Sequence, residues 1–345
     1  MATNKRLIKS NDEGGGVAAS FNTVLYDGNG GVNLIDDVGF TPDLIWIKNR
    51  DKSASHHVFD SLRADDALFT NETSQEVDYS AYIETDIVGG FKHLQSSISL
   101  NLLDDKYVAW CWKAGGSAVT NTDGTITSQV SANTEAGFSV VSYNGASTTS
   151  GDTKTIGHGL GVAPKMVITK ATNLESGWLV YHTGLTSADY FIRLNEAGGE
   201  SAAITAWGNT APTSSVFSVD FSTSTGRTGY EYIAYCFAEV EGFSSFGSYV
   251  GTGAAVNTVV TGFEPAFVMI KNSDDTGDWV MFDNKRNPTN PVNNRLMANL
   301  SSQESQNSTT RVLNFLTNGF SINSTNQDIN AINDNYIYMA FANQF

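Results

Sequence analysis

The segment G-F-T-P-D-L-I-W-I-K-N-R, residues 39–50, has a close counterpart near the other end of the chain, G-F-E-P-A-F-V-M-I-K-N-S, residues 262–273. A weaker third version, G-V-A-P-K-M-V-I-T-K, lies between them at residues 161–170. Each version has a glycine three residues before a proline and a lysine six residues after it. The prolines are Pro42, Pro164 and Pro265, and the lysines are Lys48, Lys170 and Lys271. This recurrence indicates an internally repeated fold.

Aromatic segments frame the three versions. A Tyr-x-Gly tripeptide lies upstream of each, beginning at Tyr26, Tyr143 and Tyr249. An aromatic-rich segment lies downstream: Y-V-A-W-C-W begins at Tyr107, Y-I-A-Y-C-F at Tyr232 and Y-I-Y-M-A-F at Tyr336. Order and spacing agree in all three, so coincidence is a poor explanation. We therefore predict three tandem units of about 100 residues each.

The framing segments also give the expected domain boundaries. A polar, glycine-rich N-terminal arm at residues 1–20 precedes units at residues 21–116, 138–240 and 241–345. Residues 117–137 are either a linker or an added hairpin, because N-T-D-G-T is a good turn between two polar strands. Almost nothing separates the second unit from the third, so we expect these two to abut closely.

The composition predicts an all-β fold. The chain of 345 residues contains 32 glycines, and only 16% of its residues are charged. Such a chain suits short strands and tight turns better than helices. The run after each proline is apolar throughout, as in a buried strand, and a proline at its start removes no ladder hydrogen bond. We expect antiparallel β-sandwich-like units, each with its own core.

Charge and chain-level patterns exclude several classes of protein. The net charge of −16 would repel the phosphates of a nucleic acid. No run approaches the roughly 20 apolar residues of a membrane-spanning helix, so no membrane insertion is expected. The amino-terminal basic residues are followed by no apolar run, which argues against a signal peptide. Cys111 and Cys236 hold equivalent positions, filled by Ala340 in the third unit, and we expect small buried residues rather than a disulfide.

We find no sign of catalytic machinery in the sequence. G-x-S-x-G, Walker and H-E-x-x-H motifs are absent, so we predict no enzyme, no cofactor and no metal. His182 occupies the register of Asp60 and Asp283, which argues against a fixed catalytic role at that position. The acidic segment Asp274–Asp278 has the oxygen density of a calcium loop, but its counterparts lack it. We interpret this segment as an acidic turn.

The recurrent lysines and aromatics have both structural and functional interpretations. We expect each lysine to cover the core edge with its stem while its ammonium group stays in water, although a ligand site used three times would also explain the recurrence. The recurrent aromatics fit core packing better than a binding face. If a glycan is bound, exposed Trp178 or Trp207 is the expected stacking residue.

The combination of G-F-T-P-D-L-I-W-I-K-N-R, Y-V-A-W-C-W-K-A-G-G, G-H-G-L-G-V-A-P-K-M-V-I-T-K and Y-I-A-Y-C-F-A-E-V-E-G-F-S-S-F-G-S-Y resembles a family of repeat-built virion proteins of tailed bacteriophages, notably marine ones. The resemblance spans residues 20–345. It brings no catalytic residues. The second copy departs from the pattern at Gly161–Ala163, where the other copies have G-F-x, and at His182, where they have aspartate. The surface of this copy is therefore not expected to match those of the other two in full.

The resemblance implies a structural virion protein, assembled in the host cytoplasm. We expect a tail fibre or appendage subunit that attaches to the particle through residues 1–20 and contacts the host surface. Such proteins form rods of stacked modules and symmetric homo-oligomers, usually trimers. The alternatives are a capsid-decorating protein, a non-catalytic lectin-like module that binds host glycan, and a depolymerase.

Overall fold

The computed structural model describes residues 19–343, and strands form nearly all of its regular structure. The two helices of this part of the chain, α1 (Ile204–Trp207) and α2 (Gln327–Asn330), are single turns. No helix within residues 19–343 has the length and apolar character needed to span a membrane. Every pairing between named strands is antiparallel, so the all-β prediction is confirmed.

The first unit consists of a large sheet and a small one. The large sheet has the order β1 (Phe21–Asp27), β9 (Lys106–Trp112), β3 (Leu44–Asn49), β4 (His57–Asp60), β5 (Ala64–Phe69) and β6 (Val77–Asp78). The small sheet has the order β2 (Asn33–Ile35), β8 (Gly90–His93) and β7 (Ile83–Ile87). Residues of both sheets, among them Ile45, Phe59 and Phe91, share one buried apolar cluster. The unit is therefore sandwich-like.

The second unit repeats this arrangement with additions. Its large sheet has the order β10 (Val119–Asn121), β11 (Ser128–Asn133), β12 (Phe138–Asn144), β19 (Glu231–Phe237), β14 (Met166–Ala171), β15 (Leu179–His182), β16 (Tyr190–Arg193) and β17 (Ser201–Ala202). Its small sheet pairs β13 (Lys154–Gly157) with β18 (Val216–Val219). Within residues 117–137, β10 and β11 form a hairpin that pairs with the edge of β12.

The third unit has the same strand order at its centre. The large sheet runs β20 (Ser244–Val250), β27 (Asn335–Ala342), β22 (Pro265–Asn272), β23 (Val280–Asp283) and β24 (Leu296–Met297). The small sheet runs β21 (Asn257–Val260), β26 (Gly319–Ile322) and β25 (Leu313–Leu316). In all three large sheets, the closing strand therefore lies between the opening strand and the strand that follows the recurrent proline.

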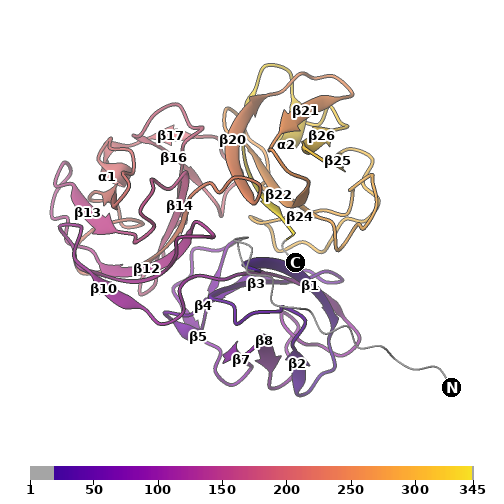
Figure 1. Ribbon diagram of the computed structural model, residues 1–345, viewed down its shortest axis with the longest axis horizontal. Coiled ribbons are helices and arrows are strands. Elements are labelled where there is room, and N and C mark those ends of the chain that lie inside the picture. Colours follow the sequence, from indigo (N-terminus) through magenta and orange to yellow (C-terminus); the bar gives the residue numbers. More distant parts are fainter. Residues whose placement is uncertain (1–18, 344–345) are drawn as a thin grey trace.

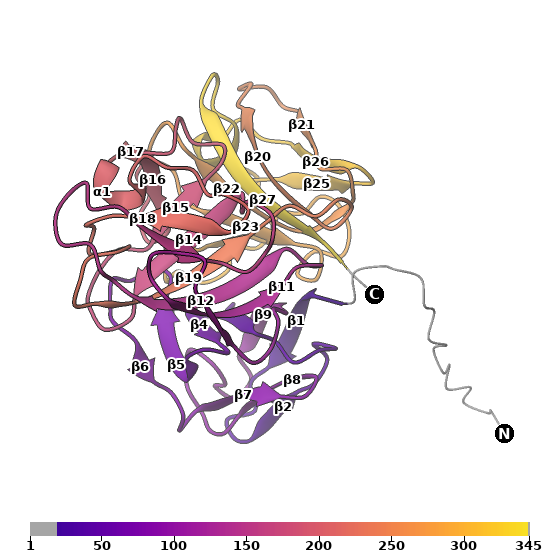
Figure 2. The same ribbon diagram turned by 60° about the vertical axis from the view of Figure 1, so that its left-hand side comes forward.

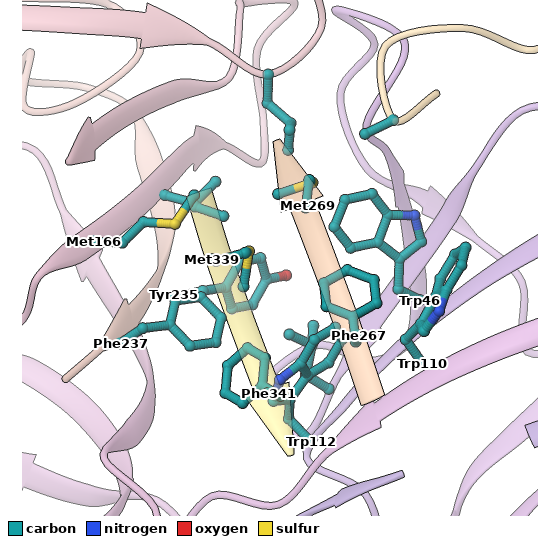
Figure 3. Close-up of a cluster of buried hydrophobic side chains, with 14 of the residues drawn as sticks. Trp46, Trp110, Trp112, Met166, Tyr235, Phe237, Phe267, Met269, Met339 and Phe341 are labelled. Atoms are coloured by element: carbon teal, nitrogen blue, oxygen red, sulfur yellow. The ribbon is translucent and has the colours of Figure 1, made fainter. Parts of the chain in front are cut away.

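The three large sheets pack against one another around a common centre (Figures 1 and 2). Trp112, Phe237 and Phe341 occupy the same position of the three closing strands, and their rings form a triangle. The ring centroids are 6.3 Å apart for Trp112 and Phe237, 6.0 Å for Phe237 and Phe341, and 5.7 Å for Trp112 and Phe341. Figure 3 shows these side chains with Phe267, Met339 and other members of the same buried cluster.

The shared centre corrects the expectation that each unit has its own core and that the units stack into a rod. Each unit does keep a separate apolar cluster between its two sheets. A fourth cluster, however, draws residues from all three units. The inner faces of the large sheets are apolar, so closing the units into a ring buries surface that a rod would leave partly exposed.

The opening and closing tyrosines pack in the same way in each unit. Their rings stack in pairs, with centroid distances of 5.0 Å for Tyr26 and Tyr107, 5.3 Å for Tyr143 and Tyr232, and 5.0 Å for Tyr249 and Tyr336. Each opening tyrosine donates its hydroxyl hydrogen bond to a backbone carbonyl of its own unit, those of Leu100, Thr225 and Ile329. The recurrent tyrosines are therefore core residues with satisfied hydroxyl groups.

The glycine of each Tyr-x-Gly tripeptide is required by close contact with backbone. A Cβ atom at Gly28, Gly145 or Gly251 would lie 2.0, 2.2 or 1.9 Å from the carbonyl oxygen of Leu102, Arg227 or Ala331, respectively. No side chain fits at such distances, because the opposing atom is backbone and cannot rotate away. This close approach explains why the glycine recurs with the tyrosine.

We predict that Gly251→Ala lowers the free energy of unfolding by about 2 kcal/mol, since the loop at Ala331 must move to admit the new methyl group. Gly198→Ala is the control, because a Cβ there has no neighbour within 4 Å. It should change the stability by less than about 1 kcal/mol. Urea unfolding measures both. Equal stabilities of the two variants would contradict the assigned role of Gly251.

Candidate functional site

Three seams join the units, and they hold most of the buried charged groups. The turn after each recurrent lysine hydrogen-bonds to the backbone of a neighbouring unit. The bonds run from Ala54 N to Ser301 O, from Ser176 N to Thr73 O and from Gly277 N to Ala197 O, at 2.9, 2.8 and 2.8 Å. We name the contacts between the first and third, first and second, and second and third units seam 1/3, seam 1/2 and seam 2/3. Together they close the ring.

The recurrent lysines are fully buried at these seams, so the expectation that their ammonium groups stay in water is wrong. Each has 0% exposed surface. Lys48 and Lys170 donate to the carbonyls of Asn49 and Ala171 at 2.7 Å. Lys271 also donates across seam 2/3 to the carbonyl of Ala197 at 3.1 Å. The strand ends here, and its last carbonyl oxygens bind the ammonium group instead of water.

Burial lowers the pKa of all three lysines, to about 8 for Lys48 and Lys271 and to about 7 for Lys170. Desolvation is the main cause, because it disfavours the charged amine. Nearby carboxylates act in the opposite direction, such as that of Glu304 on Lys48. With no exposed surface, these amines are structural donors rather than groups that a ligand can reach.

Seam 1/3 contains a buried chain of alternating charges. Asp283 accepts a hydrogen bond from Trp110 Nε1 at 3.1 Å and another from Arg286 Nε at 2.5 Å. Arg286 also donates to Glu304 at 3.1 Å, and Glu304 pairs with Arg50 of the first unit at 2.9 Å. Each buried charge thus has an opposite partner, which offsets the large cost of desolvation.

Seam 1/2 has a matching arrangement around Asp60. Tyr235 of the second unit donates its hydroxyl hydrogen bond to Asp60 at 2.7 Å, and Arg63 donates to the same carboxylate at 2.7 Å. Tyr235 stands at the strand position of Trp110, and Arg63 at the position of Arg286. In both seams an aspartate, the arginine three residues later and an aromatic donor from the next unit form one network.

Seam 2/3 replaces all three members of the network together. His182 stands in place of the aspartate, Leu185 in place of the arginine and Met339 in place of the aromatic donor. The His182 Nε2 atom lies 3.1 Å from the carbonyl oxygen of Tyr338, and Nδ1 accepts a hydrogen bond from Gly184 N at 3.0 Å. Methionine offers no hydrogen to a carboxylate, so a neutral imidazole that donates to backbone fits where aspartate would not.

Seam 1/2 also borders a polar groove of about 540 Å³. The first unit contributes the residues after β4, including Arg63, Asp66 and Glu76. The second unit contributes residues of β11, β12 and β19, including Asn144 and Glu231. Polar side chains of two units meet in this groove, and we refer to it as the seam groove.

A second hollow, of about 410 Å³, lies beside Pro42 in the first unit. Four aspartates line it, and three of them, Asp43, Asp60 and Asp65, already bind protein groups. Asp43 accepts a hydrogen bond from Ala114 N at 2.7 Å, and Asp65 accepts one from Thr85 N at 3.0 Å. In the described part of the chain, no three His, Cys, Asp or Glu side chains are grouped as metal ligands.

The acidic segment Asp274–Asp278 forms a turn whose carboxylates point to separate protein donors. Asp274 accepts hydrogen bonds from the backbone and the side chain of Asn335, both at 2.8 Å. Asp278 accepts one from Asn299 Nδ2 at 2.8 Å. The oxygens therefore fix this loop against two other segments rather than converging on one point.

The two tryptophans expected to stack on a glycan are both buried, so their predicted exposure is wrong. Trp178 is 1% and Trp207 is 2% exposed. Trp178 donates from Nε1 across seam 1/2 to the carbonyl of Phe69 at 2.8 Å. Trp207 lies on α1 and packs edge-on against Tyr181, with ring centroids 6.1 Å apart. Trp178 belongs to the apolar cluster shared by the three units, and Trp207 belongs to the second unit's own cluster.

The charged networks and the seam groove were not predicted from the sequence. One signal was available, because Asp60 and Asp283 are each followed three residues later by an arginine, whereas His182 is followed by Leu185. The second copy lacks both the aspartate and the arginine, and their joint absence indicates that these two side chains form an ion pair in the other copies. The groove has no such signal, since its walls come from segments far apart in the chain.

Residues 17–344 match a family described as "Domain of unknown function (DUF7483)". The chain belongs to this family. The match runs through all three units as one domain, in agreement with their shared apolar centre. No curated protein and no solved structure matches the chain.

We predict that His182→Asp lowers the free energy of unfolding by about 3 kcal/mol, because the new carboxylate is buried without the arginine and the aromatic donor that bind Asp60 and Asp283. The triple variant His182→Asp, Leu185→Arg, Met339→Tyr restores the network found in seam 1/2. It should recover a large part of the loss, as measured by urea unfolding. A triple variant less stable than His182→Asp alone would contradict the account.

We also predict that stability falls as the pH drops from 6.5 to 5. Burial lowers the pKa of all five histidines, to about 4 for His57 and His182 and about 3 for His93. Between these values and the unfolded pKa near 6.5, the unfolded state binds more protons. Each buried histidine then removes up to about 1.4 kcal/mol of stability per pH unit on acidification.

Denaturant unfolding at several pH values measures this dependence. The control is His182→Gln, whose amide group can also donate to the Tyr338 carbonyl but does not titrate. Its stability should change less steeply, by about one proton's contribution. A stability that is flat between pH 6.5 and 5 would exclude the proposed proton uptake.

Proposed function

We propose that this protein is a non-enzymatic structural component of a tailed-bacteriophage virion, a tail fibre or appendage subunit that contacts the host surface. The observation that supports this most directly is the use of the recurrent residues. The segments that resemble phage virion proteins build the packed interior, with the tyrosines stacked in pairs and the lysines fully buried. They serve architecture, as expected of a scaffold that presents surfaces rather than reacting groups.

The buried charged groups support the same proposal. Asp283 and Glu304 both bind Arg286 inside seam 1/3, and Asp60 binds Arg63 and Tyr235 inside seam 1/2. Groups that are fully paired and shielded from solvent strengthen an assembly but cannot reach a substrate. A rigid ring of units suits an exposed part of a particle.

Attachment to the particle is assigned to residues 1–20. Residues 1–18 of this arm lie outside the described residues, and β1 begins at Phe21. The Ser20 carbonyl accepts a hydrogen bond from Lys113 N at 2.9 Å, so the chain is already part of the fold at this residue. We further propose that the protein forms a homo-oligomer, a trimer, as phage fibres commonly do.

We predict that deleting residues 1–18 leaves the fold intact but prevents incorporation into particles. The truncated protein should keep the circular dichroism spectrum and melting temperature of the full chain. Immunogold electron microscopy of particles made with either version measures incorporation and position. Label on the tail for the full chain, and none for the truncated chain, is the expected result.

Two outcomes would contradict the proposal. Equal incorporation of both versions would show that the arm is not the anchor. Label spread over the head would identify a capsid-decorating protein instead of a tail appendage.

A further inference from the structure

We propose that the seam groove binds a saccharide that is neutral or carries amino groups. This inference deepens the proposed function and rests on it for the idea that the protein contacts a host surface. It replaces the buried Trp178 and Trp207 as the place where a glycan could bind.

The groove exists because the second unit has an added hairpin. Strand β11 pairs with the edge of β12, and Gln129 of β11 forms part of the groove wall. In Figure 1, β10 and β12 lie next to β4 and β5 of the first unit, which is the side on which the opposite wall is formed. Among the described residues, β1 and β20, the strands equivalent to β12, have no such added neighbour.

The equivalent place in seam 2/3 is filled by protein. Ser248 and Ile337 there correspond to Ser142 and Ile233 in the groove. Gly184 lies directly against them, since a Cβ on it would be 3.0 Å from Ser248 Cβ and 3.2 Å from Ile337 Cγ2. The hollow is therefore absent from this place in seam 2/3 and is not a general consequence of the ring.

Several polar side chains of the groove have no protein partner among residues 19–343. The hydroxyl of Ser142, the amide of Asn144 and the carboxylates of Asp66 and Glu231 form no side-chain hydrogen bond or ion pair within that part. Asp60, the buried acid of the neighbouring network, is in contrast paired with Arg63 and Tyr235. An amide, a hydroxyl and carboxylates together supply the donors and acceptors that bind ring hydroxyl groups.

The charge of the groove selects among saccharides. Asp66, Glu76 and Glu231 face a single guanidinium group, that of Arg63. Arg63 is already bound to Asp60 at 2.7 Å and lies 3.6 Å from Glu76. The groove is therefore negative, and it would repel a uronic acid or a sulfated sugar. Its volume of about 540 Å³ lies within the usual range for small-ligand sites and leaves room for a short oligosaccharide.

Isothermal titration calorimetry with the full chain tests the proposal. The probes are oligosaccharides of glucose, N-acetylglucosamine, glucosamine and galacturonic acid. We expect heat of binding from at least one of the first three and none from the galacturonic acid oligomer. Binding should weaken at least tenfold in the double variant Asn144→Ala, Glu231→Ala, because these two exposed residues pair across β12 and β19 at the groove.

The matched control is Asp27→Ala, Lys106→Ala. These exposed residues pair across β1 and β9 at the same two positions of the first unit, and neither lines the seam groove. This variant should bind as the wild type does. The proposal is overturned if none of the neutral or amino oligosaccharides binds, if the acidic one binds best, or if the groove variant binds as tightly as the control.

The test is independent of the test of virion location. Tail labelling without saccharide binding would remove the groove proposal and leave the proposed function standing. Groove-dependent binding by a protein that is absent from particles would do the reverse.

Discussion

The triangle formed by Trp112, Phe237 and Phe341 is the contact on which the rest of the structure depends. Three sheets can meet around one apolar centre only if each presents a large apolar side chain at the same height of its closing strand. When the three sheets pack around this centre, strand ends of neighbouring units become buried together with their backbone carbonyl and amide groups. Every polar group at the seams must then find a partner within the protein, because water is excluded.

This requirement explains the three buried lysines better than any ligand does. The strand that follows the recurrent proline ends where two units meet, and its terminal carbonyls have no further strand to bind. Lys48, Lys170 and Lys271 each return an amine to the carbonyl of the next residue. The long aliphatic stem crosses the apolar layer, and the amine binds the oxygens that the turn leaves free. Burying the amine has a cost, which is visible in the lowered pKa values.

The sequence predicts the local structure well, and the long-range structure poorly, for a physical reason. Tyr26 and Tyr107, or Gly28 and its turn, interact within one unit, so their spacing repeats and can be recognised. The hydrogen bond of Lys271 to the Ala197 carbonyl depends on where the second unit lies, and that of Trp178 to the Phe69 carbonyl depends on where the first unit lies. A charge at the end of an apolar strand is usually solvated, so the usual interpretation failed at the seams. The hairpin of β10 and β11 was one of two open alternatives, and the groove beside it follows only once two units are placed side by side.

The differences among the three copies separate what the ring needs from what it can vary. Positions that fill the centre or approach backbone closely keep their residue type, as Gly28, Gly145 and Gly251 do. Positions at a seam vary in groups, because a buried charge without its partner costs more than an apolar pair. His182, Leu185 and Met339 therefore differ together from the residues of the other seams. The hairpin next to β12 is tolerated because it pairs with an edge strand and leaves the centre unchanged. Because an edge strand has one unpaired side, a ring of sheets can gain a new surface there without losing a core contact. The seam groove lies beside the hairpin that pairs with the β12 edge.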